Sequence, residues 1–238
     1  GLQKRFGDVL AVRGVHLTAK DGTVTGLLGP NGAGKTTTLR LLSGLMRPDA
    51  GSIRVDDVDV VADPIGAQRV MGQLPDSRGL YPRLTAREHI EYFAQLHGLT
   101  RGITKERTAR LITRLGLEAI ADRRVAGFSQ GERTKVALAR ALVHQPRNVI
   151  LDEPTNGLDV MSTRAMREMI RRLAAEGCYV LFSSHVMQEV AALCDEIVII
   201  AAGRVAMHNT PDGIRNETGC DDLEEAFVRA IQHVSAGE

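Results

Sequence analysis

The spacing of apolar residues changes along the chain, and each change marks the boundary of a predicted element. Residues 9–17 (VLAVRGVHL) and 23–28 (TVTGLL) are short, rich in β-forming side chains and bounded by Gly or Asp, as strands are. In the stretch GKTTTLRLLSGL that follows, Leu39, Leu42 and Leu45 have helical spacing. The sequence therefore predicts a strand, a glycine-rich loop and a helix in direct succession.

Helical patterns dominate the segment of about 77–145. Thr85 and Glu88 form a capping-box pattern at the start of REHIEYFAQLH. A second helix is predicted over KERTARLITRLG, whose apolar residues share one face. The arginines that lie largely off that face are Arg107, Arg110 and Arg114. We interpret this basic side as a solvated face; contact with lipid headgroups or with a partner is the alternative.

From residue 148 on, strand and helix patterns alternate. The predicted strands are residues 148–153, 178–184 and 196–203, and the predicted helices are residues 161–177, 186–194 and 221–232. Alternation of this kind is typical of parallel strands joined by crossover helices. We therefore predict an α/β fold in a single domain, 1–238, with a helical subdomain inserted at about 77–145 and a helical tail at about 212–238.

Composition excludes several classes of function. The chain carries 30 Lys and Arg against 29 Asp and Glu, so its overall charge does not indicate nucleic acid or an anionic surface as a partner. Three widely spaced cysteines argue against a zinc site or a disulfide framework and indicate reduced, cytosolic thiols. No apolar run approaches the ~18 residues of a membrane-spanning helix. No secretory leader is visible, and because the chain opens almost inside a strand-like segment we expect a few starting residues to be missing.

Residues 29–36 match the phosphate-loop pattern G-x-x-x-x-G-K-S/T between a predicted strand and a predicted helix. The glycines let backbone N–H groups turn toward a β-phosphate, and Lys35 adds a charge for the β and γ oxygens. Thr36 is placed to ligate Mg²⁺. The predicted nucleotide-binding residues are Gly29, Pro30, Asn31, Gly32, Ala33, Gly34, Lys35, Thr36 and Thr37. The alternative, a glycine-rich turn with an incidental lysine, is disfavoured by the flanking elements.

Asp152 and Glu153 end the apolar strand VILDE, at the edge where open parallel sheets bind ligands. Neighbouring strand residues point to opposite sides, so we assign them different roles. Asp152 joins Thr36 in binding Mg²⁺, and Glu153 orients and polarises the water that attacks the γ-phosphate. In isolation, two solvated acids at a strand end would be the simpler interpretation.

His185 ends the next apolar strand, YVLFSSH. Parallel strands bring their carboxyl ends to one edge, so we predict that His185 lies near the γ-phosphate and senses it through a hydrogen bond. A purely structural hydrogen-bonding histidine is the alternative.

A second glycine-marked helix start lies in GFSQGERTKVALARALV. Ser129 and Gly131 stand just before an apolar helical pattern, which makes this a second anion-binding helix N-terminus. A single nucleotide has one set of phosphates, and the phosphate loop already accounts for their binding. We therefore interpret this helix start as serving the nucleotide of another subunit.

The segments GPNGAGKTT, FSQGE, VILDEP, NGLD and SSH, in this order and spacing, resemble the nucleotide-binding subunit of an ATP-binding cassette (ABC) transporter. The resemblance covers essentially the whole chain. It implies a P-loop NTPase fold with an α/β core, an N-terminal antiparallel β part and an inserted helical subdomain. It also implies ATP hydrolysis with Mg²⁺, in a head-to-tail homodimer or heterodimer that sandwiches two ATP molecules.

The resemblance also assigns residues. Ser129 and Gly131 would contact the γ-phosphate held by the second nucleotide-binding subunit, and Asp159 of NGLD would communicate across the dimer. Phe6 in KRFG would stack on adenine, with a small core aromatic as the alternative.

Two positions depart from the family pattern. The signature L-S-G-G-Q reads F-S-Q-G-E here, with Gln130 and Glu132 as the replacements after the serine. The glutamine expected to bind the cation after a proline is replaced by Asp76, whereas Gln73 comes three residues early. We place the cation-binding role on Asp76, because a carboxylate can also ligate Mg²⁺.

The segments SRGLYPRLTAREH and DDLEEAFVRAI are similar to exporters of the sodium-extrusion and multidrug type, whose transmembrane permease subunits are separate proteins. This similarity implies a peripheral location at the cytoplasmic face of the cell membrane. A soluble ABC-type ATPase acting on ribosomes or DNA is the alternative, although neither a second cassette nor a coiled-coil insertion is present. A regulator that does not hydrolyse ATP is disfavoured because Lys35, Asp152, Glu153 and His185 are all present. The transported substance is not encoded in this chain.

Overall fold

Six strands form the central sheet of the computed structural model, which describes residues 1–235. Across the sheet they lie in the order β10 (Arg204–Asn209), β9 (Glu196–Ala201), β3 (Val24–Leu28), β8 (Tyr179–Ser184), β7 (Asn148–Asp152) and β6 (Met71–Leu74). All neighbouring pairs are parallel except β10 with β9. The predicted α/β fold with a parallel sheet is confirmed.

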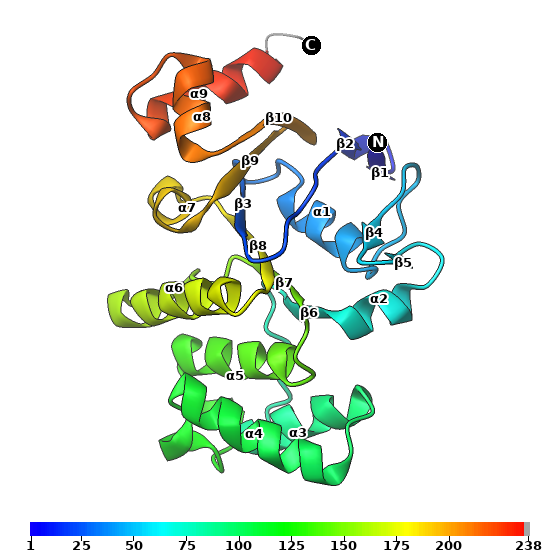
Figure 1. The fold of residues 1–238 in the computed structure, drawn as a ribbon, viewed down its shortest axis with the longest axis vertical. Coiled ribbons are helices and arrows are strands. Elements are labelled where there is room, and N and C mark those ends of the chain that lie inside the picture. The colour runs from blue at the N-terminus through cyan, green and yellow to red at the C-terminus, as the bar shows by residue number, and fades with distance from the viewer. Residues whose placement is uncertain (236–238) are drawn as a thin grey trace.

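Helices cover both faces of this sheet. The helices of the described residues are α1 (Lys35–Leu42), α2 (Pro64–Val70), α3 (Ala86–Leu96), α4 (Arg101–Leu115), α5 (Gln130–Leu142), α6 (Val160–Ala175), α7 (Met187–Leu193), α8 (Pro211–Thr218) and α9 (Leu223–Ser235). Leu151 and Phe182 pack in one apolar core with α5, α6 and α7, whereas Ile150 and Leu181 pack in a second core with α1 and α2. In Figure 1, α6 and α7 lie on one side of the strands and α1 and α2 lie on the other. Strands buried on both faces have continuous apolar sequences, which explains why β3, β7, β8 and β9 were predictable.

An antiparallel hairpin of β1 (Leu2–Phe6) and β2 (Val9–Val15) precedes the main sheet. A second antiparallel pair, β4 (Arg54–Val55) with β5 (Val58–Asp59), lies near α1 and α2 (Figure 1). The antiparallel N-terminal part expected from the resemblance is therefore present. β1 was not predicted, because Leu2 is its only buried residue and the remainder of LQKRF is polar or exposed.

The helices α3, α4 and α5 gather at one end of the molecule, between β6 and β7 in the sequence (Figure 1). The predicted capping box begins α3: the Thr85 hydroxyl accepts the Glu88 N–H at 3.1 Å, and the Glu88 carboxylate accepts the Thr85 N–H at 2.8 Å. A helical insertion into the α/β core is confirmed, while its bounds at about 77–145 stay a prediction.

The basic side of α4 differs from the solvated face that the sequence indicated. Arg114 forms an ion pair with Glu176 across to the end of α6, at 2.9 Å. Arg107 donates to the carbonyl of Val143 at 3.2 Å. Arg110 alone of these arginines pairs along its own exposed helix face. Two of the three arginines therefore join α4 to neighbouring segments.

The chain continues after β10 into α8 and α9, and α9 packs on β9 and β10. The predicted tail of about 212–238 includes residues 236–238, which lie outside the described residues. Over the part of the chain that the structure describes, no helix is both long enough and apolar enough to span a membrane.

Candidate functional site

The phosphate loop connects β3 to α1, and its glycines are required by close packing. Gly34, the N-cap of α1, has φ 102°, and a Cβ there would lie 2.5 Å from the carbonyl oxygen of Ala11. A Cβ at Gly29 would lie 2.3 Å from the carbonyl oxygen of Ile200. Only glycine fits these contacts. The loop is therefore held between β2 and the end of β9, with its backbone wrapped around the start of α1.

The Lys35 side chain lies inside the loop and is 7% exposed. Its Nζ donates to the carbonyl oxygens of Gly29 at 2.7 Å and Pro30 at 3.3 Å, and it lies 3.9 Å from Glu153 Oε1. Burial lowers the pKa of Lys35, and the charges of Glu153 and Asp152 act in the opposite direction. Lys35 is thus a partly desolvated cation in the centre of the loop, where a phosphate would lie.

A cavity of about 520 Å³ opens beside this loop and joins distant parts of the sequence. Its lining residues are Ala11, Asn31, Gly32, Ala33, Gly34, Lys35, Thr36, Thr37, Asp76, Glu153, Asn156 and His185. The predicted loop residues, the predicted water-orienting Glu153, His185 and the candidate cation ligand Asp76 therefore share one space. Ala11 and Asn156 had not been predicted; Asn156 stands in the turn just after the acidic strand, where its side chain could have been suspected.

Asp152 is buried and contacts Thr36, which lines this cavity. Thr36 Oγ1 donates to Asp152 Oδ1 at 3.3 Å, and Ser183 Oγ donates to the same oxygen at 2.6 Å. The predicted pairing of Thr36 with Asp152 is therefore present as a direct contact. The register of the sheet explains the second contact, because Asp152 of β7 and Ser183 of β8 are partners.

Glu153 and His185 face each other, with Nδ1 of the histidine 3.0 and 3.1 Å from the two carboxylate oxygens. The backbone of Glu153 has φ 47°, in the left-handed region that non-glycine residues rarely adopt. The N–H of Glu153 donates to Ser183 Oγ at 2.9 Å. Ser183 thus contacts both acidic residues. The sequence held a signal for it, a serine pair before His185, but no role had been assigned.

The oxygen ligands present suit Mg²⁺. Mg²⁺ in proteins is held by one or two carboxylates together with substrate phosphates and water. Thr36 and Asp152 offer a hydroxyl and a carboxylate beside the loop, and Asp76 lies on the wall of the same cavity. Within residues 1–235, no cluster of three or more His, Cys, Asp or Glu side chains could form a closed metal site. These oxygen ligands therefore fit a cation that is bound by the protein and by a nucleotide phosphate together.

The residues assigned to a partner subunit lie outside this cavity. Ser129 is the exposed N-cap of α5, where its hydroxyl accepts the Glu132 N–H at 3.2 Å and the Glu132 carboxylate accepts the Ser129 N–H at 2.7 Å. Asp159 caps α6 and accepts the N–H of Ser162 at 2.9 Å. A Cβ on Gly131 would lie 3.0 Å from Ser162 Oγ. The starts of α5 and α6 therefore adjoin and form one surface of the chain.

Phe6 is 47% exposed at the end of β1, with Lys4 Nζ 5.8 Å from its ring centroid. It is not a core side chain. Stacking on adenine stays a prediction for this exposed ring.

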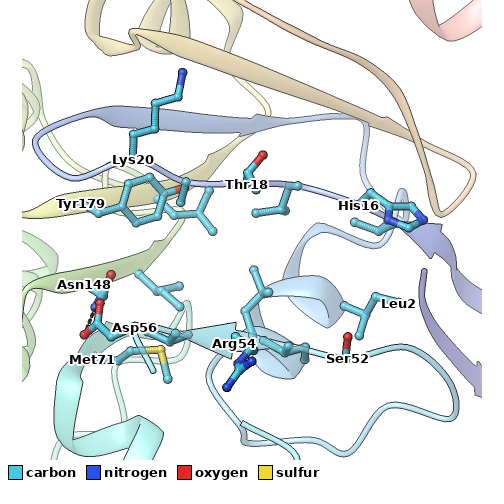
Figure 2. A pocket seen from close by; sticks show the side chains of 18 of the residues that line it. Leu2, His16, Thr18, Lys20, Ser52, Arg54, Asp56, Met71, Asn148 and Tyr179 are labelled. Atoms are coloured by element: carbon cyan, nitrogen blue, oxygen red, sulfur yellow. Dashed lines mark hydrogen bonds between the residues drawn. The ribbon is translucent and has the colours of Figure 1, made fainter. Parts of the chain in front are cut away.

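A larger cavity, about 860 Å³, lies at the opposite edge of the sheet (Figure 2). Met71, Asn148 and Tyr179, which begin β6, β7 and β8, contribute to its wall. Asn148 donates to Asp56 there at 3.2 Å, the contact dashed in Figure 2. Open parallel sheets bind their ligands at the carboxyl ends of the strands, and this is the amino edge. The phosphate-loop cavity is therefore the candidate site.

The chain is similar to known proteins over nearly its whole length. Residues 12–156 match the protein family described as "ABC transporter". The chain is 44% identical over 233 residues to the ABC transporter ATP-binding protein NatA of Bacillus subtilis (strain 168), covering 96% of this chain and 95% of that protein. It is 40% identical to the Nod factor export ATP-binding protein I of Burkholderia orbicola (strain AU 1054), covering 94% of this chain and 74% of that protein.

A solved structure described as the ATP binding subunit of an ABC transporter has a TM-score of 0.89 and 31% identity to this chain, and the match covers 96% of each. The resemblance noted in the sequence is thus supported over nearly the full length. The chain belongs to the ABC transporter family, as an ATP-binding protein.

Proposed function

We propose that this chain binds ATP with Mg²⁺ at the phosphate loop and hydrolyses it to ADP and phosphate, and that this reaction drives export through separate membrane subunits. The observation that carries the proposal is the shared cavity, which brings the loop together with Glu153 and His185 from two other strand ends. A relative named for Nod factor export supports the direction of transport.

Each polar group of the site has a role in this reaction. Lys35 and the loop N–H groups bind the β and γ phosphates, and Glu153 orients the attacking water. His185 contacts Glu153 and lines the same cavity, which supports its role in sensing the γ-phosphate through a hydrogen bond. Thr36 and Asp152 would hold Mg²⁺, with Asp76 as a further ligand. The ion would supply positive charge that neutralises the phosphate oxygens.

A second nucleotide-binding subunit completes the site. Ser129, Gly131 and Asp159 lie on the α5–α6 surface, outside the cavity of their own phosphate loop. In a head-to-tail pair, this surface covers the γ-phosphate bound by the partner subunit. The membrane subunits then place the pair at the cytoplasmic face of the membrane, where α3, α4 and α5 transmit the closing movement.

The experiment is affinity purification of the Glu153→Gln chain from detergent-solubilised native membranes in the presence of ATP, followed by mass spectrometry. This substitution removes the carboxylate that orients water while leaving the phosphate-binding residues intact, so the ATP-bound complex accumulates. Lys35→Ala, treated identically, is the matched control that does not hold ATP. We expect a multi-span membrane protein with Glu153→Gln. Ribosomal or DNA-associated proteins in its place would contradict the transporter function.

A further inference from the structure

Arg78 is a buried arginine in the segment that leaves β6, and none of the roles described above is assigned to it. It is 7% exposed. Its Nη1 donates to the carbonyl oxygens of Pro75 at 2.7 Å and Asp152 at 3.3 Å, and its Nη2 donates to the carbonyl oxygen of Glu153 at 3.0 Å. Its Nε donates to Thr134 Oγ1 on α5 at 3.2 Å. One side chain therefore joins the exit of β6, the end of β7 and α5.

The Glu153 residue that Arg78 contacts has an unfavourable backbone conformation. A non-glycine residue at φ 47° persists only where its surroundings hold it in place. At Glu153 the N–H is bound by Ser183 and the carbonyl oxygen by Arg78, with a further bond to that oxygen from the Asn156 N–H at 3.2 Å. The two side chains clamp the residue from opposite sides. The direction of the Glu153 carboxylate toward His185 depends on that backbone.

Among the described residues, the hydrogen-bond acceptors of Arg78 are neutral oxygens. Burying a guanidinium is costly unless its donors are satisfied, and here every nitrogen donates. Burial lowers the pKa of Arg78, while the nearby charges of Asp76, Asp152 and Glu153 act in the opposite direction. The planar fork of arginine reaches two successive carbonyls and a hydroxyl at once, which a lysine ammonium cannot do with the same geometry.

We propose that Arg78 is a positioning residue for ATP hydrolysis: it holds the Glu153 carboxylate in place and ties that placement to α5. The inference rests on the water-orienting role of Glu153 in the proposed function. The same guanidinium also donates to Thr134 on α5. A displacement of α5 relative to β7 would therefore weaken its hydrogen bond to the Glu153 carbonyl. Hydrolysis is thereby made dependent on the position of the helical insertion.

The test compares Arg78→Met with Arg140→Met in the full chain. Arg140 is the matched control: it is buried and donates to Gly79 in the same segment at 2.9 Å, and it lies on the ring of Phe93 instead of contacting Glu153. We expect Arg78→Met to lower kcat about 100-fold, the cost of a small misplacement of a reacting group, with KM and ATP affinity within about twofold. Arg140→Met should keep kcat within about threefold, with a comparable loss of melting temperature.

A double variant identifies the residue through which Arg78 acts. If Arg78 acts through Glu153, adding Arg78→Met to Glu153→Gln should leave the residual rate unchanged. Arg78→Lys should recover part of the rate, because an ammonium replaces some of the bonds. If Arg78→Met does not fold, Arg78→Lys in the same assay carries the test, and a wild-type kcat for it overturns the proposal.

The remaining outcomes separate this inference from the function on which it rests. Equal kcat values for Arg78→Met and Arg140→Met, or a full multiplicative loss in the double variant, overturn the Arg78 proposal while leaving the ATPase assignment intact. Wild-type turnover by Glu153→Gln alone overturns the role of Glu153, and with it the premise of the inference.

Discussion

At the scale of single residues, the main departure from the family pattern is the carboxylate of Asp76 in place of a glutamine. Asp76 lies on the wall of the phosphate-loop cavity, beside the loop and Glu153. A carboxylate contributes a full negative charge to a cation site, whereas a glutamine contributes only a dipole. If Asp76 binds the cation as we propose, the site is more negatively charged than the family pattern implies.

We predict that Asp76→Ala raises the Mg²⁺ concentration needed for half-maximal ATPase activity about tenfold, in the range found when a ligand or its support is lost. Asp76→Gln, which restores the family residue, should lie between Asp76→Ala and the wild type. The measurement is an Mg²⁺ titration of ATPase rate at saturating ATP, with Ser77→Ala as the neighbouring control. Superimposable titrations for Asp76→Ala and wild type would remove Asp76 from the cation site.

The sequence predicted that Thr36, Asp152, Glu153 and His185 gather at one sheet edge, because they belong to motifs that end there. The direct contacts of Thr36 with Asp152 and of Glu153 with His185 come from the structure. Arg78 could not be found in this way. Its partners at the site are backbone carbonyls, whose positions depend on the fold and leave no pattern in the side chains. The sequence thus predicted which side chains gather at the site, but not the side chain that holds the backbone of the site.

Among the helices and strands, those strands that are buried on both faces were predicted, whereas the strands at the two edges of the sheet were not. The edge strands β6 and β10 were missed, since β6 has four residues, MGQL, and β10 alternates polar residues in RVAMHN. The short helix α2 was missed, because its sequence PIGAQRV carries no clear apolar periodicity. Helix α8 falls within the helical tail predicted at about 212–238, but it was not separated from α9. The core elements that hold the site were the predictable ones.

The end of α3 meets the segment after α5 through two stacked histidines, His97 and His144, with ring centroids 3.7 Å apart. His144 Nε2 lies 3.0 Å from the carbonyl oxygen of Met71, at the start of β6. Burial lowers the pKa of His144 to about 4, and the charges of His97 and Arg107 act in the same direction. Burial also lowers the pKa of His97, and so does nearby Arg69. The two stacked histidines are therefore stable at this junction in their neutral form.

This junction predicts a loss of stability in acid. An unfolded histidine takes up a proton near pH 6.5, whereas folded His144 resists protonation until about pH 4. The free energy of unfolding should be unaffected by His144 above the unfolded pKa and fall as the pH decreases from 6.5 toward 4. The loss from His144 should reach roughly 2 kcal/mol by about pH 5.

Urea unfolding at about pH 7.5 and about pH 5 measures this loss. His144→Gln keeps a donor for the Met71 carbonyl and should reduce the difference between the two pH values, whereas His16→Gln, at an exposed site, should leave it as in wild type. A difference that His144→Gln does not reduce would contradict the prediction.

At the scale of the whole molecule, the two anion-binding helix starts do not face the same space. α1 begins in the phosphate-loop cavity, whereas α5 begins on an exposed surface next to the start of α6. The sequence indicated this separation, because two such starts exceed what a single nucleotide requires. The capping box of Ser129 with Glu132 matches the S-x-x-E pattern of the sequence, although it was not predicted.

We predict that Ser129→Arg lowers the ATPase rate about 100-fold and leaves the nucleotide affinity of the monomeric chain unchanged. The bulky arginine blocks only the contact between subunits. Thr210→Arg is the matched control, since Thr210 is likewise an exposed helix N-cap, on α8. Fluorescent-nucleotide binding and ATPase rate are measured on each. Loss of nucleotide binding by monomeric Ser129→Arg would contradict the cross-subunit arrangement.

The separation of the α5–α6 surface from the chain's own phosphate loop has a genetic consequence. In a head-to-tail pair made of two copies of this chain, each ATP site takes its loop from one copy and its covering surface from the other. A chain defective at Lys35 still carries an intact covering surface, and a chain defective at Ser129 still carries an intact loop. Two inactive alleles of this gene would therefore hold one complete site between them, and would complement each other only as a mixed pair.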